Sequence, residues 1–217
     1  MTVAFASAVV SWLRSEKSET VPYTRKLFHF IIFSAACIFQ LRFGLKMTVL
    51  FGIVVCAVVI FAVCKGAGHG LYDAVARPKD SPHEGIFILL PLASTALGGV
   101  AANLWFPHTA FIGYLVAGWA DAAAEPVGAA WGRRRYRVPS LFGVKAERSL
   151  EGSLAVLGTA CVAVFLCGCV MHLGWDASLR MALACGFCAA IVEAVSHHGL
   201  DNLTVQVAVS GMAALFV

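Results

Sequence analysis

Seven long apolar stretches constrain this chain more than any other feature of its sequence. They cover residues 27–43, 47–64, 85–106, 109–131, 152–173, 177–199 and 203–217. Most are close to the roughly 17–25 residues that a helix needs to cross a bilayer. The strands of a membrane barrel alternate between apolar and polar residues, and these stretches do not. The sequence therefore predicts an all-α fold, a polytopic membrane helical bundle with about seven transmembrane helices.

The polar residues gather between these stretches and define one domain. Charged residues make up only 13% of the 217 residues, against roughly 25% in a soluble protein. We expect a single integral-membrane catalytic domain over 1–217, with cytoplasmic loops at 65–84 and 133–151. Residues 1–26 are predicted to form an interfacial N-terminal segment, because their apolar part is too short to span and lacks the charge order of a secretory signal.

The basic residues predict the orientation of the bundle. If Arg25 and Lys26 are cytoplasmic and each stretch crosses once, 13 of the 16 Lys and Arg residues fall on the cytoplasmic side. Only Arg42, Lys46 and Arg180 fall on the other. This bias agrees with the positive-inside rule and predicts an integral protein of a bacterial inner (plasma) membrane with its polar face in the cytoplasm. The net charge of +4 thus reflects topology, and no nucleic-acid partner is expected.

Four acids lie inside or at the edge of apolar stretches: Asp121, Glu125, Glu193 and Asp201. Burying a carboxylate in hydrocarbon is costly, so such residues usually face a cavity, a cation or a partner. Asp121 and Glu125 are neighbours on one helix face. A divalent cation between them would relieve their repulsion. Protonation of one acid, or pairing with an arginine of the following loop, would relieve it too.

A cationic loop follows these acids directly. It contains six basic residues between positions 133 and 148, namely Arg133, Arg134, Arg135, Arg137, Lys145 and Arg148. A solvated loop on the positive-inside side would look the same. However, the loop ends in RSLEGS (148–153), where Ser149, Gly152 and Ser153 permit close backbone approach to an anion. No lysine follows a glycine, so the chain has no Walker A motif.

Two further polar groups flank the apolar stretches. RKLFHF (25–30) places Arg25 and His29 on one helix face at the start of the first stretch, where snorkelling is the alternative explanation. Asp201 and Asn202 open the last stretch and could cap its helix, complete a site, or do both. The eight cysteines lie in or beside apolar stretches, where Cys behaves as a small hydrophobic residue, so no cysteine-bound metal is predicted.

These motifs together resemble the polyprenol kinase family. RKLFHF, ADAAAEPVGAAWGR (120–133), RSLEGS, Glu193 and the Asp-Asn pair at 201–202 occur in the family's order and with similar spacing. The family includes dolichol, phytol and farnesol kinases and CTP-dependent diacylglycerol kinases. Ala120 stands where the family commonly has Gly, and Arg148 where it commonly has Lys. Arg keeps the charge and adds a bidentate fork, which leaves the choice of nucleotide open.

The resemblance implies a lipid-alcohol kinase that uses Mg²⁺ and a nucleoside triphosphate, often CTP. The expected partners are a lipid alcohol (an isoprenoid alcohol or diacylglycerol), the nucleotide and the bilayer. The catalytic residues are predicted to be Asp121, His29, Arg148 and Glu151. The phosphate-binding residues are predicted to be Arg133, Arg135, Lys145, Ser149, Gly152, Ser153, Arg25 and Lys26. The metal ligands are predicted to be Asp121, Glu125 and Asp201, with Glu193 and Asn202 in support.

Two other functions fit part of the same pattern. A phosphatidate cytidylyltransferase would also use CTP, Mg²⁺ and a lipid, but its acid-rich C-terminal signature is missing here. A small lipid or anion transporter could use the same buried acids and arginines, although such proteins often contain inverted repeats. The sequence favours the kinase and leaves the lipid, the base that deprotonates it and the oligomeric state open.

Overall fold

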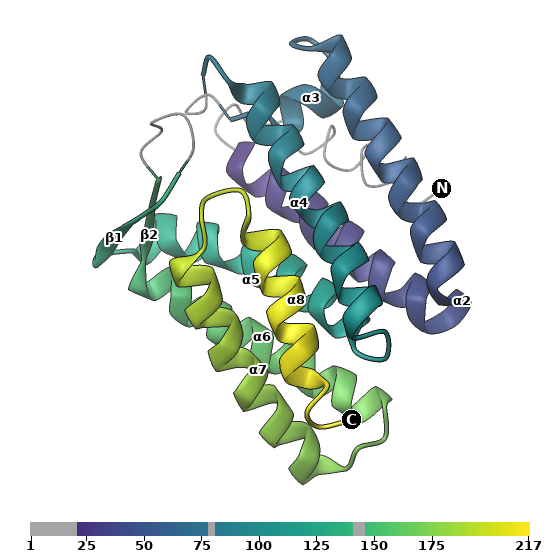
Figure 1. The fold of residues 1–217 in the computed structure, drawn as a ribbon. Coiled ribbons are helices and arrows are strands. Elements are labelled where there is room, and N and C mark those ends of the chain that lie inside the picture. Colours follow the sequence, from purple (N-terminus) through teal and green to yellow (C-terminus); the bar gives the residue numbers. More distant parts are fainter. Residues whose placement is uncertain (1–20, 78–80, 141–145) are drawn as a thin grey trace.

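The helices of the protein follow its apolar stretches. The computed structural model describes residues 21–77, 81–140 and 146–217, and Figure 1 shows their arrangement. The elements, in chain order, are α2 (Val21–Lys65), α3 (Gly70–Val75), α4 (Glu84–Trp105), α5 (Ala110–Trp131), β1 (Arg135–Val138), β2 (Ala146–Ser149), α6 (Leu150–Val170), α7 (Trp175–Val195) and α8 (Asp201–Ala213). The predicted helical architecture is confirmed, with one short pair of strands added.

Helix α2 contains the first two apolar stretches and reverses direction between them. Gly44 adopts φ 75°, ψ −179°, a left-handed backbone region that Gly enters without a steric penalty. The chain therefore turns back on itself there (Figure 1). Phe39 and Phe51 stack across the turn with ring centroids 4.9 Å apart. We call residues 21–43 and 45–65 the first and second halves of α2.

The predicted interfacial segment, residues 1–26, overlaps the start of α2. Residues 1–20 of the expected interfacial segment lie outside the described residues. Residues 21–26 form the first turns of α2 and are not a separate segment. Arg25 and Lys26 are therefore helical and buried, with 7% and 6% of their surface exposed.

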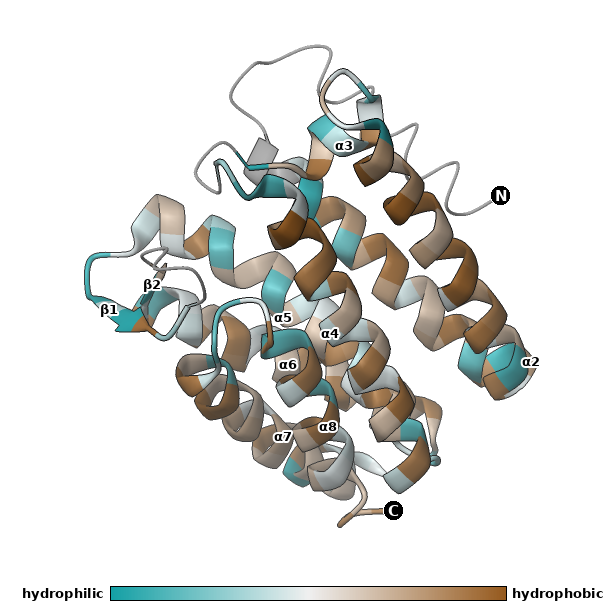
Figure 2. Cartoon of the chain, turned by 45° about the horizontal axis from the view of Figure 1, so that its top comes forward, coloured by the Kyte–Doolittle hydropathy of each residue, from teal (hydrophilic) through white to brown (hydrophobic). Residues whose placement is uncertain are grey.

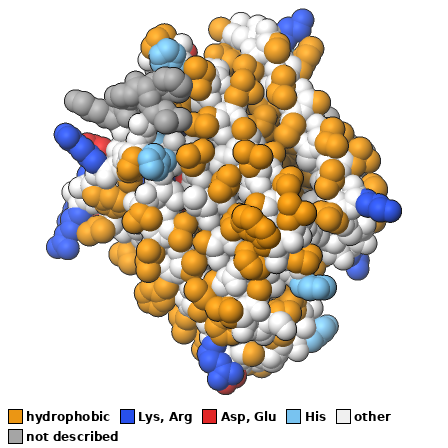
Figure 3. All heavy atoms as spheres, in the orientation of Figure 1, with side chains coloured by type: hydrophobic (Ala, Val, Ile, Leu, Met, Phe, Trp, Pro, Cys, Tyr) orange, Lys and Arg blue, Asp and Glu red, His pale blue; other side chains and the backbone are white. Residues whose placement is uncertain are grey.

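Four helical stretches of the described chain are long and apolar enough to cross a membrane. They are Thr24–Lys65, Glu84–Trp105, Leu150–Val170 and Trp175–Val195. Helices α5 and α8 are not among them, so the number of seven spans stays a prediction. Large apolar side chains are exposed on several helices, for example Phe61, Leu104 and Ile191. They spread over the face shown in Figure 3, with Lys and Arg at its edges, as expected for a lipid-facing surface.

The polar segments of the described chain lie together at one end of the bundle. The β1–β2 hairpin, α3 and the turn between α7 and α8 are at this end, which we call the polar end (Figure 1). The turns at Gly44, between α4 and α5 and between α6 and α7 are at the opposite end. Figure 2 shows the hairpin as hydrophilic and most of α2 and α4 as hydrophobic. A membrane bundle with one polar end is thus built from distant parts of the sequence.

Small residues allow α5 to pack at the centre of the bundle, between α2, α6 and α8. A Cβ atom added to Gly118 would overlap the side chain of Phe33 in α2. One added to Gly113 would overlap Ser210 and the backbone of Gln206 in α8. Small residues at such contacts let helix backbones approach closely, which is how helices associate in membranes. The position of the acids on α5 depends on this packing.

We expect Gly118→Ala to destabilise the fold by about 1–3 kcal/mol, because the added methyl group overpacks the α2–α5 contact. Gly158→Ala in α6 is the matched control, since a Cβ there meets no atom within 4 Å. That change should be neutral or stabilise by up to about 1 kcal/mol through helix propensity. Unfolding of both variants in detergent measures the difference. Equal stability of the two would contradict the packing assigned to Gly118.

The cationic loop contains an antiparallel hairpin that the sequence did not predict. Arg135 pairs with Ser149, and Val138 pairs with Ala146. Strand β2 runs directly into α6, whose N-cap is Ser149: its side chain accepts a hydrogen bond from the backbone N–H of Gly152. The backbone N–H of His198 donates to the carbonyl of Pro139 at 2.8 Å. The hairpin is therefore joined to both α6 and the α7–α8 turn.

Candidate active site

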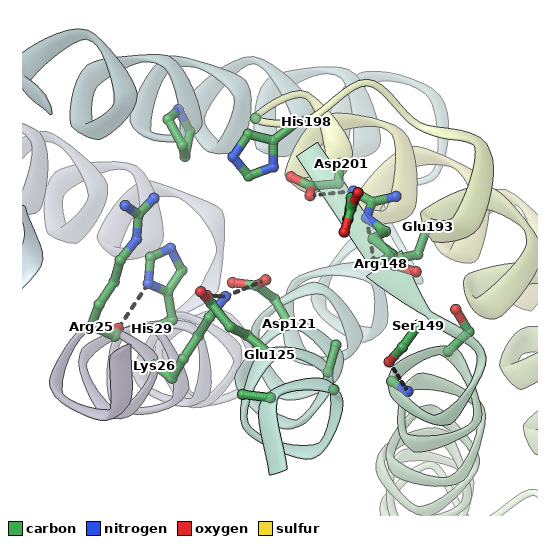
Figure 4. A pocket seen from close by; sticks show the side chains of 18 of the residues that line it. Arg25, Lys26, His29, Asp121, Glu125, Arg148, Ser149, Glu193, His198 and Asp201 are labelled. Carbon is green, nitrogen blue, oxygen red and sulfur yellow. Dashed lines mark hydrogen bonds and ion pairs between the residues drawn. The ribbon is translucent and has the colours of Figure 1, made fainter. Parts of the chain in front are cut away.

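One cavity at the polar end gathers most of the predicted site residues. Its volume is about 260 Å³, and Figure 4 shows the side chains around it. The predicted site residues that line it are Arg25, Lys26, His29, Asp121, Glu125, Arg135, Arg148, Ser149, Gly152, Ser153, Glu193, Asp201 and Asn202. We call it the polar pocket. It is formed by six of the described helices, α2 and α4 to α8, and by the hairpin.

Lys26 holds the two acids of α5 together. Its Nζ lies 2.6 Å from Asp121 Oδ1 and 3.1 Å from Glu125 Oε2. Arg77, which follows α3, approaches Glu125 Oε1 at 3.6 Å. Thus the charge between the two carboxylates comes from a lysine on α2. It does not come from an arginine of the following loop, which was one of the alternatives.

Arg148 holds a second pair of acids on the other side of the polar pocket. Its Nε lies 2.9 Å from Glu193 Oε1, and its Nη2 lies 2.8 Å from Asp201 Oδ2. Its Nη1 donates to the carbonyl of Ser196 at 3.3 Å. A guanidinium can engage two carboxylates at once because its donors form a fixed fork. Arg148 therefore joins β2 to α7 and α8.

The start of α8 is fixed by side chains from two directions. Asp201 Oδ1 accepts the backbone N–H of Asn202 at 3.0 Å, and its Oδ2 pairs with Arg148. Asp201 is the first residue of α8 and the N-cap position is Leu200, so Asp201 does not occupy the capping position that was one of its predicted roles. Asn202 Nδ2 donates to Thr95 Oγ1 of α4 at 2.9 Å. Asn202 is almost fully buried, with 3% exposed. Its role is thus to hold α8 against α4 beside the pocket.

The start of α6 approaches α5 closely. A Cβ at Gly152 would lie 3.0 Å from the carbonyl oxygen of Ala124, and one at Gly128 would lie 2.9 Å from Ser149 Oγ. Ser153 Oγ and Tyr136 Oη lie 2.7 Å apart. Burial raises the pKa of Tyr136, so the phenol remains protonated at neutral pH and can donate this bond. These contacts seat the hairpin over the polar pocket.

His29 and Arg25 form the α2 side of the polar pocket, as their spacing predicted. His29 Nδ1 lies 3.0 Å from the carbonyl oxygen of Arg25. A carbonyl oxygen only accepts, so Nδ1 carries the proton and Nε2 of the neutral ring has the lone pair. Arg25 donates to the carbonyls of Val75 and Phe87, at 3.5 and 3.3 Å. These two guanidinium hydrogen bonds therefore link α3 and α4 to α2.

Two of the predicted site residues that the structure describes, Arg133 and Glu151, do not line the polar pocket. Arg133 is exposed, and Glu151 in the first turn of α6 accepts a hydrogen bond from the backbone N–H of Arg134 at 3.4 Å. Lys145 lies outside the described residues. The predictions for Arg133 and Glu151 assumed that the whole loop faces the site. Arg133 precedes β1 and Glu151 lies in the first turn of α6, so neither belongs to the paired strands, whose residues Arg135, Arg148 and Ser149 line the polar pocket.

Sequence reasoning missed three charged or polar residues of the polar pocket. Arg77 and His198 both line it, and their Nη2 and Nε2 atoms lie 3.1 Å apart. Glu147 of β2 also lines it. Arg77 is 5% exposed. Its burial shows that the segment after α3 folds back onto the bundle. The linear sequence contains no spacing that reveals this return.

The acids of the polar pocket suit a metal ion whose remaining ligands are phosphate groups and water. Among the described residues, no three His, Cys, Asp or Glu side chains form a ready metal site. Mg²⁺, however, usually takes one or two carboxylates and completes its shell with phosphates and water. Glu193 Oε2 is buried and has no hydrogen-bond partner in the described structure. The donor set therefore fits a metal that arrives with phosphate groups.

Comparison with known proteins gives one informative similarity. The chain is 38% identical over 108 residues to a phytol kinase of Synechocystis sp.. The predicted resemblance is confirmed. The matched region covers 48% of this chain and 42% of the phytol kinase, so the chain spans less than half of that relative. No family model and no solved structure matches the chain.

Proposed function

We propose that the protein is a membrane-embedded lipid-alcohol kinase. It transfers the terminal phosphate of a nucleoside triphosphate, with CTP as the proposed donor, to the hydroxyl group of an isoprenoid alcohol or diacylglycerol. The main support is the polar pocket, where Lys26 and Arg148 each join two carboxylates at the polar end of an apolar bundle. The similarity to a phytol kinase supports the same reaction class.

Phosphoryl transfer requires positioning and charge stabilisation more than covalent chemistry by the protein. The alcohol oxygen forms a bond to the γ-phosphorus, while the bond from that phosphorus to the β–γ bridging oxygen breaks. The nucleoside diphosphate leaves with the bridging oxygen. Negative charge on the phosphate oxygens must be matched throughout, and Lys26, Arg135 and Arg148 are the cations we assign to this task.

Ligand binding would exchange the partners of these charges. In the described structure Lys26 and Arg148 neutralise acids. On phosphate binding both cations would turn to phosphate oxygens, and Asp121 and Asp201 would then be free to hold Mg²⁺. Bound there, Mg²⁺ would neutralise charge on the phosphates. Glu125 keeps Arg77 as a partner at 3.6 Å, so we assign it a smaller part in metal binding.

The hydroxyl proton needs an acceptor, and His29 is our choice. Its Nε2 has a lone pair when Nδ1 donates to the carbonyl of Arg25. A general base must reach the proton that it removes, and His29 lies where the polar pocket meets apolar side chains. Asp121 is the alternative base. The lipid would reach this point sideways from the bilayer, and the polar end would face the cytoplasm of an inner membrane.

Product analysis with doubly labelled CTP tests the reaction. The purified full chain is incubated with Mg²⁺, farnesol or diacylglycerol, and CTP labelled in the base and in the γ-phosphate. We expect CDP and a lipid phosphate that contains only the γ label. Release of pyrophosphate with the base label on the lipid, in a parallel reaction with phosphatidate as the acceptor, would establish a cytidylyltransferase. Anion or lipid flux in sealed liposomes without nucleotide consumption would establish a transporter.

A further inference from the structure

A second, apolar cavity adjoins the polar pocket. Its volume is about 70 Å³, and Arg25, His29 and Pro91 line both cavities. Away from these shared residues its walls are almost entirely apolar, with Thr95 as the other polar residue. We call it the apolar groove. Its contact with the polar pocket places a hydrocarbon environment directly beside the proposed phosphate site.

The two halves of α2, together with α4, build the apolar groove. Phe28 and Ile32 of the first half face Val55 and Val59 of the second half, and Ile88 of α4 closes the wall. All five are buried, with 5–9% of their surface exposed. Gly44 makes this possible, because the reversal of α2 brings its two halves against each other. The groove is therefore part of the packed fold.

The groove extends from the polar end into the apolar bundle. Arg25 and Phe33 mark its ends along α2, and eight residues of helix correspond to about 12 Å. The second half of α2 runs back toward the polar end, so Val55 lies one turn deeper than Val59. A molecule in the groove with its head at His29 would point its tail away from the charges.

From this geometry we propose that the apolar groove binds the hydrocarbon chain of the acceptor alcohol next to its hydroxyl group, and that it accepts one chain. The inference rests on the proposed kinase function. Pockets that hold whole drug-sized ligands measure roughly 300–1,000 Å³, against about 70 Å³ here. A space of this size holds the first few carbon atoms of one hydrocarbon chain, and it has no room for a second chain beside the first. The substrate class is thus a single-chain alcohol.

Filling the deep part of the groove tests the proposal. Val55→Phe should lower kcat/KM for farnesol by about tenfold or more through KM, since a hydrophobic pocket discriminates on this scale. Val54→Phe is the matched control, as Val54 is 45% exposed on the outer side of the same helix. Equal effects of both variants, or wild-type preference for diacylglycerol, would overturn the proposal.

Photolabelling separates this proposal from the kinase assignment and does not require active variants. A photoreactive farnesol analogue is added to the wild-type protein in lipid nanodiscs, and labelled peptides are mapped. We expect labels on residues 28–33 and 55–59, and less labelling in Val55→Phe than in Val54→Phe. Labels confined to other surfaces would refute the groove. Labels in the groove without phosphate transfer from any nucleotide would retain the groove and refute the kinase.

Discussion

Replacing Asp121 by Asn should lower phosphoryl transfer by at least about 10²–10³-fold, the scale seen when one electrostatic contact of a transition state is lost. Asn has nearly the same shape and can still accept a hydrogen bond from Lys26 Nζ, which lies 2.6 Å from Asp121 Oδ1. The fold should therefore survive. What disappears is the negative charge proposed to hold Mg²⁺ opposite the phosphates. The measurement is kcat at saturating nucleotide and lipid, with unfolding in detergent as the check on folding.

Asp176→Asn is the control for this experiment. Asp176 also pairs with a cation, Arg180 at 3.3 Å, but the pair lies in the first turns of α7 with 88% and 67% of the side chains exposed. Its loss should leave activity unchanged. We also expect Asp121→Asn to require a higher Mg²⁺ concentration for its residual activity. Full activity of a folded Asp121→Asn protein would disprove the metal assignment.

Removing the charge of Arg148 should have the largest effect on stability. Arg148→Met leaves Glu193 and Asp201 without their shared partner, with only 14% and 20% of their side chains exposed. Breaking a buried ion pair by removing one partner costs about 3–5 kcal/mol. The loss should appear as a lower midpoint of unfolding in detergent. Activity should also fall, because the same guanidinium is proposed to bind phosphate.

Two further variants show whether the cost arises from the stranded carboxylates. Arg180→Met breaks an exposed pair, which is worth at most about 1 kcal/mol, and should change stability little. Adding Glu193→Gln to Arg148→Met removes one uncompensated charge and should restore part of the lost stability. If the double variant is as unstable as Arg148→Met alone, the acids do not depend on Arg148 as the structure indicates.

The sequence predicted the helices well because hydrophobic length is a local property. Each apolar stretch became a helix, and the reversal at Gly44 separates the first two as expected. The acids of α5 could be identified because a carboxylate in an apolar helix requires compensation. Lys26 as that compensation could not be identified, because it lies 95 residues earlier and only the packing of α2 against α5 brings it near.

Local reasoning failed where loops fold back on the bundle. Arg135 at the start of β1 and Arg148 in β2 line the polar pocket, whereas Arg133, which precedes β1, does not. Composition alone could not separate the cations that reach the pocket from the one that does not. Arg77 and His198 come together across 121 residues. Such contacts follow from tertiary packing, and no spacing rule in a single sequence reveals them.

The paired charges of the polar pocket also determine which anions the ligand-free protein binds weakly. Lys26 and Arg148 each already contact two carboxylates, so a bare anion such as inorganic phosphate must compete with acids fixed in place. A ligand that delivers its own counter-ion replaces both sides of these bonds together. Free inorganic anions should therefore be poor inhibitors of the proposed kinase, and its selectivity would come from the requirement for a metal-complexed ligand.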